Sequence, residues 1–342
     1  MLTLINGPIV GLGARTFISE AKEEARKDGN NLRVFHFAEE ITKATGFDFL
    51  SFMSLNDFQR NAIRENIFRA IADQIKDTQD DVVIRVVTTV EWRDVNQKFK
   101  DVDIISKLLK PDRIVTLMDS EKNMLSRMQS TIAEGNELSR LTRDYLRIGD
   151  SSSGEEEVLD WLNEEVSIGE DWAKSLNIRQ VVFSVNESPS ALARLCTQKD
   201  LKCFYVSYPM TFLTQHPEFR EQKDKLVEGL SSRGVVIDPM AVELVKNASS
   251  AATAYTVERD LHWIVKKVDA VVGIQPDPPV FSFGMLDEFQ HAKGYGVPSF
   301  MIFPAGSGGP FGEDQFLDKS RMFKDLASLL ASTEFNKLFP ES

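Results

Sequence analysis

The chain has 342 residues with 52 acidic and 40 basic side chains, which gives a formal net charge of −12 at pH 7. This acidic balance, with a pI of about 5.0, argues against a broad basic surface for nucleic acid. The two cysteines, Cys196 and Cys203, are too few and too widely spaced for a disulfide framework or a zinc site, and we expect no metal.

The length favours two domains, and a hydrophobic fraction of 42% is ample for packed cores. No apolar run approaches the roughly 18 residues needed to span a bilayer. The N-terminal MLTLINGP lacks the basic region of a signal peptide. We therefore expect a cytoplasmic protein with no membrane partner.

Strands and helices alternate along the first half of the chain. The helical segments include 55–77, where apolar residues recur at helical spacing. Short apolar runs typical of strands lie at 2–7, 33–38, 82–87, 113–119 and 181–185. This alternation predicts a largely parallel sheet covered by helices.

A second alternation begins after the polar stretch 197–202. Strands are predicted at 203–209, 235–239, 269–274 and 298–303, with helices between them, among them 217–234 and 257–268. We therefore expect two three-layer α/β domains with mainly parallel sheets, at 1–198 and 199–342.

The first strand is followed by the glycine-rich turn GPIVGLGART, residues 7–16. Such a loop before a helix can aim backbone N–H groups at a phosphate. Gly11, Gly13, Arg15 and Thr16 are the candidate nucleotide-binding residues, but the lysine of the P-loop pattern is replaced by Ala14. The alternative interpretation is a glycine turn that only packs the helix on the strand.

Residues 1–195 resemble a small nucleotide kinase of the archaeal adenylate kinase type. The resemblance rests on this loop and on LNDFQRNAIRENIFRAIA, LKPDRIVTLMDSEKNMLSRM and LSRLTRDYLR. It implies a P-loop fold in which ATP and magnesium are possible ligands, with Arg140, Arg143 and Arg147 as lid arginines. Without the lysine we expect poor phosphoryl transfer, because the planar group of Arg15 does not replace a point charge.

Three segments of the second half occur in the order of another family. They are FYVSYPM, ERDLHWIVKKVDAVVG and SFGMLDEFQHAKGYGVP, the last with the form S-x-G-x-x-x-E. Over about residues 203–310 the chain resembles the nucleoside 2-deoxyribosyltransferases and their nucleotide N-glycosidase branch.

The resemblance implies a role for each matching residue. Glu288 is the implied nucleophile, which forms a covalent glycosyl intermediate; Asp260 is the implied general acid, and Tyr205 orients Glu288. Serine replaces the aspartate usual in the transferases, which implies a 5′-monophosphate substrate. The implied substrate-binding residues are Ser282, Gly284, Ser207 and Ser307.

We therefore predict an enzyme that hydrolyses the N-glycosidic bond of a (deoxy)nucleoside 5′-monophosphate without a cofactor. It would act as a homo-oligomer, at least a dimer, with a small-molecule nucleotide as its partner. The alternatives are a nucleoside 2-deoxyribosyltransferase and a non-catalytic nucleotide sensor. At the level of residues, Glu288 could instead be a first-turn acid favoured by the helix dipole, and Asp260 an exposed helix residue. Asp287 is predicted to be a solvated or capping residue.

Overall fold

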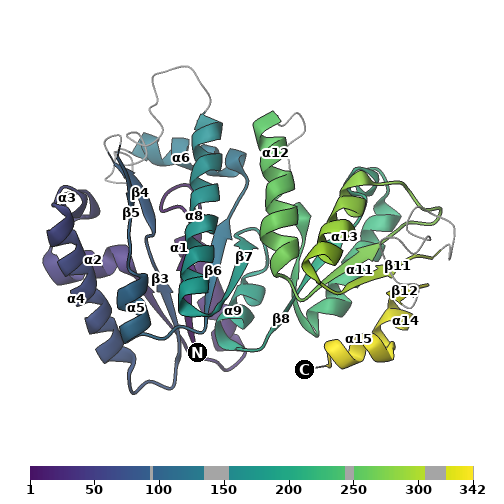
Figure 1. Ribbon diagram of the computed structural model, residues 1–342, viewed down its shortest axis with the longest axis horizontal. Coiled ribbons are helices and arrows are strands. Elements are labelled where there is room, and N and C mark those ends of the chain that lie inside the picture. Colours follow the sequence, from purple (N-terminus) through teal and green to yellow (C-terminus); the bar gives the residue numbers. More distant parts are fainter. Residues whose placement is uncertain (93–94, 135–153, 243–249, 305–320, 342) are drawn as a thin grey trace. The chain divides into compact units, whose positions relative to one another are not determined.

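The computed structural model describes residues 1–92, 95–134, 154–242, 250–304 and 321–341 (Figure 1). Contacts divide the chain into two compact units. The main part of the first unit is Met1–Lys199, and the second unit comprises Asp200–Leu244 and Thr253–Ser342. Each unit contains one five-stranded parallel sheet with helices packed on it, so the predicted α/β fold class is confirmed.

The first sheet has the strand order β2-β3-β1-β6-β7. Its strands are β1 (Leu2–Asn6), β2 (Leu32–His36), β3 (Asp81–Arg85), β6 (Arg113–Met118) and β7 (Arg179–Ser184). From β1 the chain runs to the edge strand β2 and returns to β3, which lies between β2 and β1. It then crosses to β6 on the other side of β1. Ligands bind at such a switch point, outside the carboxyl ends of the strands.

Helices cover both faces of this sheet. Gln180 and Phe183 on β7 point to opposite faces because side chains alternate along a strand. Gln180 donates to the carbonyl of Val166 on α8 at 2.9 Å, and Phe183 stacks on Phe17 of α1 with ring centroids 6.3 Å apart. The helices are α1 (Ala14–Lys27), α2 (Phe37–Thr45), α3 (Phe49–Met53), α4 (Asp57–Ile75), α5 (Val102–Leu108), α6 (Glu121–Glu134), α8 (Gly154–Leu176) and α9 (Pro189–Thr197).

Two details of the first unit differ from the sequence prediction. The strand expected at 33–38 ends at His36, because α2 begins at Phe37, whose ring is buried with Ile41 one turn later. An antiparallel hairpin of β4 (Thr89–Trp92) and β5 (Val95–Lys98) follows β3.

The second sheet has the order β12-β11-β10-β8-β9. If β8 is counted as strand 1 and the sheet is read from its β9 edge, this is the doubly wound order 2-1-3-4-5. The switch point of that order lies between the first and third strands. Here these strands are β8 and β10. The strands are β8 (Lys202–Ser207), β9 (Gly234–Ile237), β10 (Ala270–Ile274), β11 (Ser299–Ile302) and β12 (Met322–Phe323).

One face of the second sheet is closed by an aromatic core, in which Phe204 and Phe300 pack against Phe335 and Phe339 of the C-terminal segment. The helices are α10 (Met210–Leu213), α11 (Pro217–Ser231), α12 (Ser250–Glu258), α13 (Phe283–Tyr295), α14 (Leu326–Leu330) and α15 (Thr333–Leu338). The regular helix expected at 257–268 is wrong in detail, because Arg259–Ile264 is π-helical and Val265–Lys267 is a 3₁₀ turn. Among the described residues, no helix is both long and apolar enough to cross a membrane.

Candidate active site

Three of the predicted site residues meet at the carboxyl end of β8, beside the switch point of the second sheet. Tyr205 and Ser207 lie two residues apart on β8, so their side chains point to the same face. The Tyr205 hydroxyl donates to Glu288 Oε1 at 2.7 Å, and the Ser207 hydroxyl donates to Glu288 Oε2. Both hydroxyl-bearing residues are fully buried and Glu288 is only 8% exposed. Ser207, predicted to bind substrate, thus contacts the implied nucleophile.

The start of α13 explains how Glu288 reaches this position. The helix begins at Phe283, and the Ser282 side chain caps it by accepting from the Met285 backbone N–H at 3.4 Å. Glu288 therefore lies in the second turn, on the same buried face as Met285 and Phe289. Gly273 on β10 lets α13 approach, since a Cβ there would lie 2.7 Å from the Phe289 ring.

One interpretation of the acids on α13 is wrong, and the prediction for Asp287 is confirmed in part. All residues of α13 are described, and none in its first turn is acidic, so Glu288 is not a first-turn acid. Asp287 does not cap the helix, because Ser282 does, but its side chain is exposed, as expected of a solvated residue. On the same helix, Asp287 is thus exposed to solvent, whereas the adjacent Glu288 is buried.

Burial and the negative charge of Asp260 raise the pKa of Glu288 to about 8. The hydrogen bonds from Ser207 and Tyr205, and the positive charge of Arg259, oppose this rise. Burial also raises the pKa of Tyr205 well above its ordinary value, with help from the charges of Asp260 and Glu288. The Tyr205 hydroxyl therefore remains a donor to Glu288.

Asp260 is a buried residue, so its interpretation as an exposed helix position is wrong. It lies in the π-helical segment and is 6% exposed. Its Oδ1 accepts from Nε of the preceding residue, Arg259, at 2.7 Å, and Arg259 is itself 2% exposed. Sequence reasoning missed Arg259, although an arginine directly before a candidate catalytic aspartate was a visible signal.

The remaining predicted substrate residues lie at or near the start of α13. In its capping bond Ser282 Oγ accepts, and among the described residues it donates to none, so its proton can be donated to a phosphate oxygen. Gly284 is exposed, and a Cβ there would meet only Ser282 Oγ, at 4.0 Å. Sequence reasoning also missed Phe281 and Phe283, which flank Ser282, are exposed, and contact each other edge to face. Ser307 lies outside the described residues.

The glycine loop of the first unit borders a cavity of about 580 Å³ at the carboxyl ends of β1, β2 and β3. Gly11, Gly13 and Arg15 line this cavity, whereas Thr16 is not among the lining residues and its side chain is exposed on α1. Gly11 has a φ of 75°, and a Cβ there would lie 2.8 Å from Met128. The exposed Arg15 side chain pairs with Glu39 at 2.9 Å.

Side chains from other elements hold the backbone of this loop. The Arg85 guanidinium donates to the carbonyls of Gly7 at 2.6 Å and Pro8 at 3.0 Å, and burial lowers the pKa of Arg85 to about 10. Arg127 Nε donates to the carbonyl of Gly11 at 2.6 Å. The Gly7 N–H donates to the buried carboxylate of Glu165 at 3.0 Å. These loop groups are therefore satisfied within the protein. The implied lid arginines Arg140, Arg143 and Arg147 lie outside the described residues.

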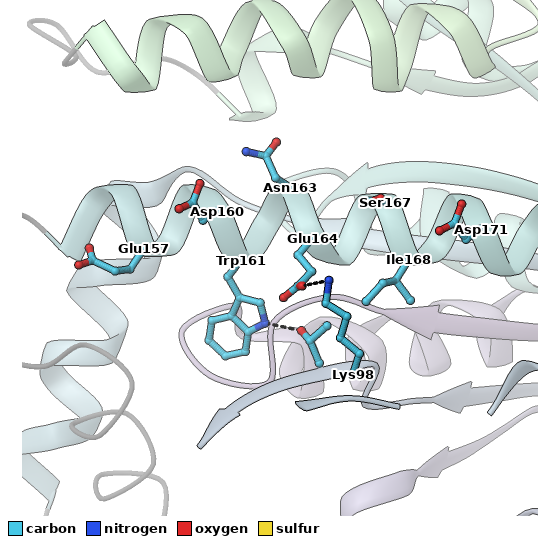
Figure 2. A pocket seen from close by; sticks show the side chains of 10 residues that line it. Lys98, Glu157, Asp160, Trp161, Asn163, Glu164, Ser167, Ile168 and Asp171 are labelled. Carbon is cyan, nitrogen blue, oxygen red and sulfur yellow. Dashed lines mark hydrogen bonds and ion pairs between the residues drawn. The ribbon is translucent and has the colours of Figure 1, made fainter. Parts of the chain in front are cut away.

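A second cavity in the first unit, of about 590 Å³, lies along α8 and contains none of the predicted site residues. Figure 2 shows Lys98 of β5 and Glu164 of α8 pointing toward each other, and their charged groups are 2.6 Å apart. The lining acids are Glu157, Asp160, Glu164 and Asp171. In the parts of the chain that the structure describes, no three such side chains are placed to hold a metal ion.

Comparison with known proteins identifies no family for this chain. No family model matches it, and no curated protein matches it. A solved structure that it resembles is an unliganded sugar kinase from Janibacter sp. HTCC2649, with 13% sequence identity and a TM-score of 0.30. That likeness covers 58% of this chain and 95% of the kinase, and it is too slight to carry an argument about activity.

Proposed function

We propose that the second unit hydrolyses the N-glycosidic bond of a (deoxy)nucleoside 5′-monophosphate. The observation that carries the proposal is the buried carboxylate of Glu288, held on both oxygens by Tyr205 and Ser207 at the switch point of a doubly wound sheet. The segments that resemble the deoxyribosyltransferases supply the choice of substrate. The free donor proton of Ser282 suits a phosphate group.

In the proposed reaction, Glu288 attacks C1′ of the sugar while the bond from C1′ to the base nitrogen breaks. The base leaves with the bonding electron pair and takes up a proton. Water then attacks C1′ of the glycosyl ester, which releases the sugar phosphate and frees the Glu288 carboxylate. Tyr205 orients the carboxylate throughout.

The departing base takes its proton from Asp260, the proposed general acid, and the attacking water later returns a proton to Asp260. Burial favours the protonated form of Glu288, so Glu288 must lose this proton before it attacks C1′.

The proposal is tested by incubating the full chain with a panel of nucleoside 5′-monophosphates and nucleosides and separating the products by chromatography. Free base together with sugar phosphate supports hydrolysis. Transfer of the sugar to an added second base would instead identify a deoxyribosyltransferase. Binding without any release of base would favour a nucleotide sensor.

Ser282→Asp is expected to lower kcat/KM for a 5′-monophosphate by at least about tenfold more than for the matching nucleoside, because it sets a negative charge against the phosphate. Ser282→Asn is the matched control, since asparagine and aspartate both cap helices well and differ here only in charge. Steady-state kinetics on both substrates measures the effect. Equal losses on both substrates would refute the phosphate contact.

For the first unit we propose a nucleotide-binding or scaffold role without efficient phosphoryl transfer. The loop does not fit a reactive magnesium–ATP complex. Ala14 stands at the lysine position, and the buried carboxylate of Asp119, a candidate metal ligand after β6, is taken by an ion pair with Arg127.

We therefore expect a coupled ADP-release assay with ATP and nucleoside monophosphates to show no turnover near the usual kinase range of roughly 1–100 s⁻¹. Calorimetry with ATP and AMP separates the two proposed roles, because a scaffold gives no heat of binding. Turnover within that range would show that another cation replaces the lysine.

A further inference from the structure

The cavity beside the glycine loop of the first unit has a wall of large apolar side chains. Its volume of about 580 Å³ lies within the range of ordinary small-molecule sites. The apolar side chains come from the loop, α2, α3 and the turn after β3, and they belong to Ile9, Val10, Phe37, Phe49, Leu50 and Val87. A ligand that fills this space therefore has an apolar or aromatic body.

One lining residue, Arg85 at the end of β3, carries a buried positive charge and is only 8% exposed. Its Nη atoms donate to four backbone carbonyls, which belong to Ile5, Gly7, Pro8 and Val86. The described residues place no acid in an ion pair with Arg85. The charge of Glu165 only partly opposes the fall in the pKa of Arg85 that burial causes. Since buried charges are normally paired, an anion in the cavity would supply the missing partner.

Two further arginines line the same cavity. The Arg127 guanidinium is held by Asp119 through Nη2 and by the carbonyl of Gly11 through Nε. The Arg15 side chain is 79% exposed and pairs with Glu39 at 2.9 Å. Among the described lining residues, three are arginines and Glu39 alone is acidic. The wall of this cavity is therefore cationic, although the chain has a formal net charge of −12.

Two of these guanidinium groups keep donors for a ligand. Nε of Arg85 and Nη1 of Arg127 make no observed hydrogen bond with the described residues. Arginine N–H groups match phosphate oxygens in both charge and geometry. Burial lowers the pKa of His36, which also lines the cavity, so its ring is neutral at pH 7 and adds no charge.

We propose that this cavity binds a small organic phosphate monoester, with its phosphate on the free N–H groups of Arg85 and Arg127 and its apolar or aromatic body against the wall. The inference rests on the nucleotide-binding role proposed for the first unit, and it names the ligand class and the donors. Neither arginine is among the site residues predicted from the sequence. Binding of this kind needs no lysine at Ala14 and no magnesium ion, because side-chain cations neutralise the phosphate.

The first test is calorimetry with phenyl phosphate, AMP and inorganic phosphate. The full chain carries Glu288→Gln, so that no base is released during the titration. At least one ester is expected to bind about tenfold or more tightly than inorganic phosphate, because its body buries apolar surface. Tighter binding of AMP identifies a nucleotide as the source of the ester, and tighter binding of phenyl phosphate a simpler one. Equal affinity for inorganic phosphate and the tighter ester, or no heat with either ester, would overturn the proposal.

The second test places the ester in the cavity. Ala38 lines it from α2, and Ala38→Phe fills the space without removing a charge or a hydrogen bond. Arg85→Gln removes the unpaired charge. Each variant is expected to weaken binding of the tighter ester by at least about tenfold. Arg26→Gln is the control, because Arg26 lies outside the cavity on α1, is 78% exposed and pairs only with Glu23.

Arg85→Gln also removes donors from the glycine loop. Should it not fold by circular dichroism, Ala38→Phe decides the question alone. Binding that survives Ala38→Phe would overturn the inference. If Ser282→Asp abolishes that binding, the ester belongs to the second unit and the substrate class proposed there is supported. If AMP binding survives Ser282→Asp as well, the nucleotide-binding role stands at another site.

Discussion

Glu288→Gln is expected to abolish base release while the second unit stays folded. The amide has nearly the shape of the protonated carboxyl and fits the same buried space between Tyr205 and Ser207. An amide oxygen is a poor nucleophile, so no glycosyl ester forms. We expect kcat/KM to fall on the order of 10³-fold or more. Product release followed by chromatography measures this, with circular dichroism as a check on folding.

Asp287→Asn is the matched control for this variant. It removes the adjacent carboxylate on the same helix, but the Asp287 side chain is exposed and contacts none of the catalytic groups through an observed hydrogen bond. Its activity should stay within about twofold of the wild type. A Glu288→Gln variant that turns over at the wild-type rate would place the nucleophile elsewhere.

The pairing of Tyr205 with Glu288 was predictable only through the resemblance. The two residues are 83 positions apart, and nothing in their local sequence joins them. The alternation of strands and helices predicted the parallel sheet, because the period of apolar residues reports local structure directly. The interpretation of Glu288 as a first-turn acid was wrong, since Ser282 caps the helix several residues before the acids.

The surroundings of Asp260 were beyond sequence reasoning for a different reason. A regular helix through 257–268 gives each side chain a fixed direction. The interpretation of Asp260 as an exposed residue assumed such a helix. The π-helical turn changes the register within a few residues, and apolar periodicity does not reveal such a turn. The buried pair with Arg259 followed from that change.

In the first unit, the glycine loop was visible in the sequence but its internal partners were not. Arg85 binds loop carbonyls 78 and 77 residues away, and Glu165 accepts from Gly7 across 158 residues. Such bonds depend on how distant elements pack, which no local pattern encodes. The same loop sequence suits a phosphate or an internal carboxylate, since both accept bonds from backbone N–H groups.

Glu165→Ala is expected to destabilise the first unit by about 3–5 kcal/mol. The carboxylate is 1% exposed and accepts from four groups: the Asn6 amide, the Gly7 N–H and the hydroxyls of Thr88 and Thr89. Alanine would leave these buried donors without their acceptor and Arg85 without a nearby negative charge. Urea unfolding followed by tryptophan fluorescence measures the loss, because Trp161 and Trp172 are buried on the same helix as Glu165.

Glu164→Ala separates this effect from the loss of any acid on α8. Glu164 is the adjacent residue, and it pairs at 2.6 Å with Lys98, whose side chain is 57% exposed. Exposed pairs contribute about 0–1 kcal/mol, so the control should stay within about 1 kcal/mol of the wild type. If Glu165→Ala lost no more stability than Glu164→Ala, the four donors would have found other acceptors in place of the Glu165 carboxylate. A large loss in Glu165→Ala alone would show that this carboxylate holds the glycine loop to the sheet.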